Sequence, residues 1–197
     1  LPRIPLKAAL AAGLELLHPG QPDATVVSIG AQGFFVAEVV GGHVRRLREN
    51  TRCSQGTGNF LRQLVERFGL PVAEADRLCE GVADPCPLSG RCPVILKTDM
   101  THLANRGEGR NRILAGLYDA VCENVQTLVR WQESPRALLL LGGVARSARI
   151  RDHFARQAHL HGLRMVGAKD GRDAFLPAFG AAVMARHEGN AVAADRL

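Results

Sequence analysis

The sequence has few aromatic residues, no long hydrophobic run and no cysteine pair at the spacing of a zinc ribbon. Its purely apolar runs, such as residues 137–141, are far shorter than the roughly 18 residues that cross a bilayer. No charged stretch followed by an apolar one opens the chain, so no export signal is expected. These absences predict a soluble, cytoplasmic protein without a membrane partner.

Only 5% of the residues are aromatic, and the arginine cluster Arg45, Arg46 and Arg48 contains no interleaved Tyr, Phe or Trp. Proteins that bind single-stranded nucleic acid stack bases on such rings. We therefore expect a solvated basic face and no nucleic-acid partner. The net charge of +6 still permits a smaller acidic partner such as a nucleotide or a coenzyme.

The five cysteines are an odd number, and none forms a CxxC pair. A disulfide framework is not expected in such a chain, and reduced thiols are the default. Any metal site must be assembled from cysteines that are distant in the sequence, or from two chains.

The hydrophobic periodicity predicts helices at residues 7–17, 57–68, 73–78, 94–104, 112–131, 146–161 and 174–186. Strands are expected at residues 24–29, 34–40, 43–47, 137–141 and 163–166. Three adjacent strands joined by tight turns, followed by strands that alternate with helices, predict an α/β fold with a mixed sheet covered by helices.

A single lobe is expected over residues 1–197. We divide it into a leading helix (1–22), a β-meander with a helix (24–68), a helical insertion (69–133) and a second half of the sheet (134–197). The chain starts at Leu1 rather than at Met, and we expect a further N-terminal portion outside this sequence.

Three glycine-bearing turns follow expected strands: Gly30-Ala31-Gln32-Gly33, Gly56-Thr57-Gly58 and Gly142-Gly143-Val144-Ala145. Glycine lets backbone amides approach a phosphate or a purine ring, and a helix N-terminus after the turn favours an anion. Each turn taken alone is more simply explained as a hairpin or a strand-to-helix connection.

Taken in order with two cysteines, these turns resemble a known family. Residues 50–61, with Cys53 followed by Gly56-Thr57-Gly58, are similar to the cysteine motif of the ATP-dependent activators of 2-hydroxyacyl-CoA dehydratases and the ATPase subunits of benzoyl-CoA reductase. Residues 90–99, with Cys92, resemble the second cysteine motif of this family. Residues 142–145 resemble its adenosine loop, and residues 179–182 its closing helix.

The resemblance implies a ribonuclease-H-like lobe of the actin, Hsp70 and sugar-kinase type. It also implies that Cys53 and Cys92 of each of two subunits hold one [4Fe-4S] cluster at a homodimer interface, which four thiolates would satisfy. ATP would then drive an electron from the cluster to a partner dehydratase or reductase. Cys79, Cys86 and Cys122 match no ligand position, although Cys86 is a rival for Cys92 because the two are close in sequence.

The sequence departs from the family where the second phosphate loop usually carries two acids and a lysine. Ser28 and Gly33 replace the acids, and Phe35 replaces the lysine. A carboxylate there would orient Mg²⁺ or the attacking water, so ATP or ADP with Mg²⁺ is expected to bind weakly or not at all. Gln32 is the residue left to position a water.

The resemblance implies that the first phosphate loop lies in an N-terminal lobe outside this sequence, so independent ATP hydrolysis by this chain is not expected. A sugar-kinase-like or chaperone-like ATPase would explain the glycine turns but would give Cys53 and Cys92 no role, so it ranks last. Two other functions stay open. The chain is either an electron-transferring activase lobe or a degenerate, non-catalytic lobe that acts as an interaction element of a larger protein.

Overall fold

The first three strands form an antiparallel meander because short turns join them. The computed structural model describes residues 3–50, 57–88, 92–167 and 171–194, with side chains to residue 186. In it, β1 (Ala24–Ile29) pairs with β2 (Phe34–Val40), and β2 pairs with β3 (His43–Glu49). Gly41 and Gly42 turn β2 into β3 with positive φ angles of 58° and 74°, which glycine adopts without steric cost. The predicted bounds are confirmed for β1 and β2, and β3 is two residues longer than predicted.

Two parallel strands complete the sheet. β4 (Ala137–Leu141) lies beside β1, and β5 (Arg164–Val166) lies beside β4, which gives the strand order β3-β2-β1-β4-β5. The expected mixed sheet, with three antiparallel strands and two that alternate with helices, is confirmed.

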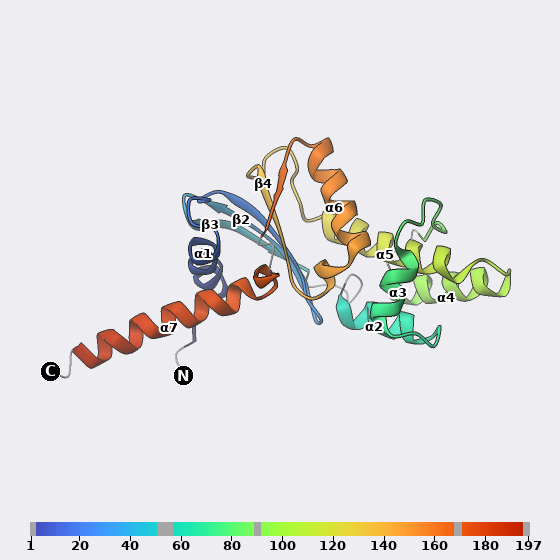
Figure 1. Ribbon diagram of the computed structural model, residues 1–197, viewed down its shortest axis with the longest axis horizontal. Coiled ribbons are helices and arrows are strands. Elements are labelled where there is room, and N and C mark those ends of the chain that lie inside the picture. Colours follow the sequence, from blue (N-terminus) through green and yellow to red (C-terminus); the bar gives the residue numbers. More distant parts are fainter. Residues whose placement is uncertain (1–2, 51–56, 89–91, 168–170, 195–197) are drawn as a thin grey trace.

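Helices cover both faces of this sheet (Figure 1). On one face, α1 (Leu6–Leu17) and α7 (Leu176–Ala194) pack on residues such as Val26 and Leu139. The opposite face, which carries Val27 and Leu138, is covered by a larger helical layer. That layer contains α2 (Gly58–Glu66), α3 (Val72–Cys79), α4 (Pro93–Asn105), α5 (Arg110–Gln126) and α6 (Ala148–Leu160). Because neighbouring residues of a strand point to opposite faces, one sheet serves two cores.

The helices α1 and α7 cross closely at two glycines. A Cβ atom at Gly13 would overlap the carbonyl oxygen of Leu176, and one at Gly180 would overlap the carbonyl oxygen of Ala9. Glycine at both positions therefore lets the two backbones touch.

The predicted helix at residues 112–131 is wrong at its C-terminal end. α5 ends at Gln126, and Thr127 follows as its C-cap and donates its hydroxyl proton to the Asn124 carbonyl. Trp131 lies beyond the helix and stacks on His161, with ring centroids 5.1 Å apart. Trp131 thus keeps the helical spacing of the sequence without being helical, and it packs against His161 and against Phe154 of α6.

The helix predicted from residue 146 also begins later. A 3-10 turn, η1 (Val144–Arg146), follows β4, and α6 begins at Ala148 after the N-cap Ser147. A second 3-10 turn, η2 (Arg172–Phe175), leads into α7. In the part of the chain that the structure describes, no helix combines the length and the apolar character that crossing a membrane requires.

Candidate functional site

The glycine turns predicted to act together meet at the carboxyl ends of β1 and β4. A Cβ atom at Gly58 would come within 2.8 Å of the Val144 side chain and 3.2 Å of the Ala31 Cα. Only glycine allows the start of α2 to lie against both the β1–β2 turn and the turn after β4. In open α/β sheets, ligands bind at the carboxyl ends of parallel strands, so this edge is the candidate site.

Gly142 holds the turn after β4 against β1. Its φ is +88°, and a Cβ atom there would overlap the carbonyl oxygen of Ile29. The neighbouring Gly143 is exposed, and no atom lies within 4 Å of the position its Cβ would take. The first glycine therefore shapes the turn, whereas the second leaves its backbone open to a ligand.

The amides at the start of α2 are already bonded within the protein. The N–H groups of Gly58 and Asn59 donate to the carbonyl oxygens of Gly30 and Ala31, both at 2.8 Å. The Phe60 N–H donates to the hydroxyl of the N-cap Thr57 at 3.3 Å. These three donors are not free for a phosphate, so the anion expected at a helix N-terminus would find no open amide at this one. Instead, the bonds fix α2 to the β1–β2 turn.

A cavity of about 610 Å³ opens between these turns and the helical layer. Three of the predicted residues line it, namely Gly58, Gly143 and Val144. Gly30, Thr57, Gly142 and Ala145 shape the surrounding turns without lining the cavity, and Gln32 is exposed on the β1–β2 turn outside it. Gly56 lies outside the described residues.

The far wall of the cavity comes from side chains that the sequence analysis did not select. Asp76 of α3 accepts a hydrogen bond from the Ser147 hydroxyl, and both residues line the cavity. The guanidinium groups of Arg62 and Arg146 add positive charge to the lining. Tyr118 closes the wall, and burial raises the pKa of its hydroxyl, which therefore stays protonated.

Cys92 is the N-cap of α4 and is half-buried. Its side chain makes no capping hydrogen bond, and the next residues after Pro93 are the exposed Val94 (70%) and Ile95 (53%). A negatively charged group at this place would interact favourably with the helix dipole. Cys53, the other predicted ligand, lies outside the described residues.

The remaining cysteines are buried thiols. Burial raises the pKa of Cys79 to about 12 and also raises the pKa of Cys122. Burial and the nearby Glu108 raise the pKa of Cys86, whose thiol points to that carboxylate with Sγ 3.9 Å from Oε2. A cysteine binds a metal as a thiolate. The surroundings of Cys86 disfavour its thiolate form, so Cys86 is a poorer candidate ligand than Cys92. Among the described residues, no group of three or more His, Cys, Asp or Glu side chains could hold a metal.

The strand order and the glycine turns at the carboxyl ends of β1 and β4 correspond to an actin-like fold. The chain belongs to the BadF/BadG/BcrA/BcrD ATPase family, whose sequence pattern matches residues 8–185. The resemblance found in the cysteine and glycine motifs is thereby confirmed.

Two curated relatives cover much of the chain. It is 27% identical over 135 residues to the 2-hydroxyisocaproyl-CoA dehydratase activator of Clostridioides difficile, a match that covers 68% of this chain and 50% of the activator. It is 28% identical over 173 residues to the uncharacterized protein YjiL of Escherichia coli strain K12, covering 87% of this chain and 65% of that protein. The chain thus spans between half and two thirds of the length of these relatives.

A solved structure has the same fold. The activator of the 2-hydroxyisocaproyl-CoA dehydratase from Clostridium difficile, with bound ADPNP, superposes with a TM-score of 0.84 at 23% identity. The match covers 98% of this chain and 69% of that one. The expected actin-like fold is therefore confirmed over nearly the whole chain.

Proposed function

We propose that this chain is the nucleotide-binding, cysteine-bearing lobe of an ATP-dependent activator that passes electrons to a CoA-ester dehydratase or reductase. The observation that carries the proposal is the place of Cys92. It is half-buried at the start of α4, next to exposed apolar residues, whereas Cys79, Cys86 and Cys122 are buried. The family membership and the similarity to a dehydratase activator support it.

The cavity between the glycine turns is the proposed place of the adenosine part of ATP or ADP. Its volume of about 610 Å³ suits a ligand of this size. Gly143 and Val144 would lie along the nucleoside, and Asp76 would accept hydrogen bonds from its hydroxyl or amino groups. Arg62 and Arg146 would supply the flat cations that stack on aromatic rings or pair with phosphate.

The proposed [4Fe-4S] cluster would be held by Cys53 and Cys92 of each of two chains. The fit rests on donor chemistry, because such clusters take four thiolates and the buried thiols of Cys79, Cys86 and Cys122 are held in the protonated form. Two ligands from each chain require a second copy. Val94 and Ile95 offer an apolar contact surface beside Cys92 for that homodimer. When bound, the cluster would supply a low-potential electron. Its cysteine ligands must stay free of disulfides, which fits a reducing, cytoplasmic location.

Hydrolysis of ATP by this chain alone is not part of the proposal. Ser28 and Gly33 occupy positions where the family usually has acids, and no atom lies within 4 Å of the position a Cβ at Gly33 would take. Neither residue supplies a carboxylate to the phosphate end, and the space beside Gly33 is open. Gln32, exposed on the same turn, is the proposed residue for positioning a water once the N-terminal lobe is present.

Anaerobic reconstitution with iron and sulfide tests the cluster. We expect a broad absorbance from sulfide-to-iron charge transfer, together with a shift of the chain to a dimer in light scattering. Cys92→Ala and Cys53→Ala should each abolish both, whereas Cys122→Ala, which changes a buried thiol, should retain them. Full colour in Cys92→Ala would contradict the proposal.

The alternative is a degenerate lobe that serves as an interaction element, and the missing acids at positions 28 and 33 favour it. Nucleotide binding separates the two functions. A ligand at one hundred times its Kd stabilises a protein by about 2.7 kcal/mol, so ADP should raise the Tm of the activase lobe. Arg146→Ala should reduce this shift, and Arg106→Ala, at the end of α4, should not. No shift with the unmodified chain would favour the scaffold.

A further inference from the structure

A groove of about 440 Å³ crosses the edge of the sheet opposite to the glycine turns. It lies at the amino ends of the parallel strands β1, β4 and β5, and its lining includes Arg45, Arg136 and Arg164. These three arginines come from β3, from the residue before β4 and from the start of β5, so that segments far apart in the sequence bring their guanidinium groups to one place.

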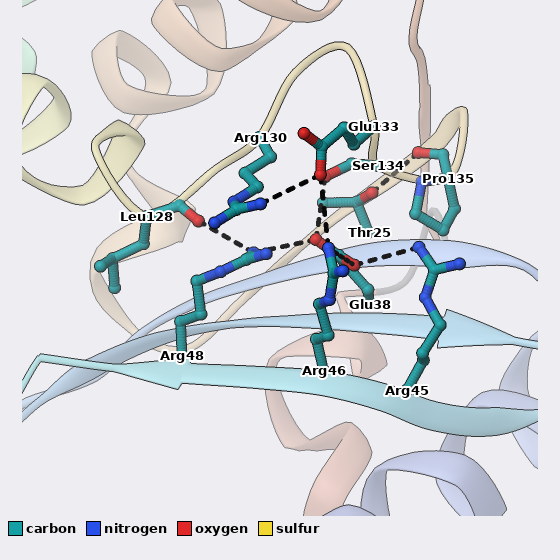
Figure 2. Close-up of polar contacts among 10 residues, drawn as sticks. All are labelled: Thr25, Glu38, Arg45, Arg46, Arg48, Leu128, Arg130, Glu133, Ser134 and Pro135. Atoms are coloured by element: carbon teal, nitrogen blue, oxygen red, sulfur yellow. Dashed lines mark hydrogen bonds and ion pairs between the residues drawn. The ribbon is translucent and has the colours of Figure 1, made fainter.

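A β-bulge in β3 contributes to this arrangement. Glu38 pairs with Arg46 and Val39 pairs with Val44, so Arg45 is the extra residue of the bulge. Bulges redirect side chains that would otherwise alternate between faces. Figure 2 shows the side chains of Arg45, Arg46 and Arg48 rising on the same side of β3 toward Glu38.

Glu38 is the centre of the cluster and is fully buried. Arg48 donates to its Oε1 at 2.9 Å and Arg45 to its Oε2 at 3.3 Å, while Arg46 lies 3.8 Å from Oε2. Burial raises the pKa of Glu38, but the hydrogen bonds and charges of the arginines outweigh it and hold the pKa below its usual value. One carboxylate thus faces three guanidinium groups.

The positive charge of this corner exceeds the negative charge. The arginines of the cluster and groove are Arg45, Arg46, Arg48, Arg130, Arg136 and Arg164, and the carboxylates are Asp23, Glu38 and Glu133. The difference of three charges is half of the net charge of +6 carried by the whole chain. The groove itself is lined by three of these arginines and two of the carboxylates, which leaves one net positive charge in a concave site, and such charge attracts anions.

The two acids that line the groove are engaged elsewhere. Asp23 accepts the backbone N–H of Gly41 at 2.7 Å, and Glu133 pairs with Arg130 and Arg46 at 3.1 and 3.3 Å. By contrast, the described partner of the Arg164 side chain is the neutral Gln21, and Arg136 donates to the carbonyl oxygens of Trp131 and His161. Neither arginine has an ion pair among the described residues.

We propose that this groove binds a small phosphate-bearing anion, at a site separate from the nucleotide edge. A guanidinium group matches the oxygens of a phosphate in a bidentate manner. A phosphate ester carries about −1.5 to −2 charges at neutral pH. It therefore suits two arginines without ion pairs, Arg136 and Arg164, better than a single carboxylate would. The groove is larger than one phosphate, so it has room for the organic group attached to it.

Titration calorimetry at constant ionic strength tests the proposal, with pyrophosphate as the probe. We expect saturable binding of one pyrophosphate. Orthophosphate and citrate are titrated for comparison. Saturable but weaker binding of orthophosphate supports a phosphate site. Citrate binding as tight as pyrophosphate binding overturns the proposal. The Gly143→Asp variant, which places a negative charge at the nucleotide edge, removes that edge from competition and should not alter the titration.

Arg164→Gln is the decisive variant. Removing the guanidinium group of Arg164 breaks only one described side-chain interaction, the hydrogen bond to Gln21. It should weaken pyrophosphate binding at least tenfold with an unchanged circular dichroism spectrum. Arg136→Gln provides a second variant with the same expected result, and Arg106→Gln is the matched control on a distant surface. Affinity in Arg164→Gln and Arg136→Gln equal to that of the unmodified chain would overturn the proposal.

Discussion

Single residues at the glycine turns have different roles that the sequence does not separate. Gly142 and Gly143 are neighbours, yet only Gly142 has a positive φ and a Cβ position filled by backbone. We expect Gly142→Ala to lower the free energy of unfolding by about 2–3 kcal/mol, since overpacking alone costs about 1–3 kcal/mol. Gly143→Ala should leave stability within about 0.5 kcal/mol. Urea denaturation of both variants measures the difference, and equal losses would contradict the role given to Gly142.

Glu38 makes stability depend on pH. Replacing it with Gln would leave the arginines without their buried partner, and the loss should lie at the lower end of the about 3–5 kcal/mol seen when one member of a buried pair is removed. The lower end is expected because Arg45 and Arg46 are half exposed.

The folded pKa of Glu38 is lowered, so its contribution is present above the unfolded pKa of about 4.3 and is lost as the pH falls through the folded value. The stability difference between the unmodified chain and Glu38→Gln should therefore shrink in acid. Denaturation from pH 3 to pH 7 measures this trend, and a constant difference would argue against the ionised carboxylate.

At the level of elements, the N-cap of α2 links a helix to the candidate site. The buried hydroxyl of Thr57 accepts the Phe60 N–H. Thr57→Ala should cost about 1 kcal/mol and should also weaken ADP binding, because the α2 start packs against the turn after β4. Thr57→Ser keeps the acceptor and serves as the control. Thermal shifts with and without ADP separate the two effects.

Arg149 of α6 joins three helices. It makes a bidentate ion pair with Asp119 of α5 and donates to the carbonyl oxygens of Cys79 and Val82 at and beyond the end of α3. Hydrogen bonds to charged groups contribute about 1.5–3 kcal/mol, so Arg149→Ala should lower the unfolding free energy by about 2–3 kcal/mol. The exposed Arg151 on the same helix provides the control, Arg151→Ala. A loss as small as in that control would mean that the three-helix contact is not held by Arg149.

The sequence predicted the strands better than the ends of the helices. The apolar runs of β1, β2 and β4 are bounded by glycine or proline turns, so their limits were visible. No such breaker follows Gln126 before Ser134-Pro135, and the end of α5 is set by the packing of Trp131 on His161, which is a tertiary contact. The glycine turns of the site could be predicted as well, because the same glycines that end the strands form these turns. Asp76 was not, because nothing in its local sequence shows that α3 faces Ser147.

At the level of the whole molecule, the proposed dimer depends on a surface beside Cys92. Val94 is 70% exposed, so Val94→Asp should not change the stability of the monomer beyond about 0.5 kcal/mol. It should nevertheless prevent the reconstituted chain from dimerising. Val183→Asp, on the half-buried surface of α7 far from Cys92, is a control for added charge. Light scattering after reconstitution measures the effect, and an intact Val94→Asp dimer would place the contact elsewhere.

The close crossing of α1 and α7 has a consequence for the synthesis of the protein. The packing partner α7, which meets α1 at Gly13 and Gly180, is synthesised more than 150 residues after α1. Until then the apolar side of α1 has no α7 to cover it, and contacts of such separation form slowly. We conclude that this face of the sheet closes only after α7 has been synthesised, and that until then the apolar side of α1 is accessible to chaperones and proteases (Figure 1).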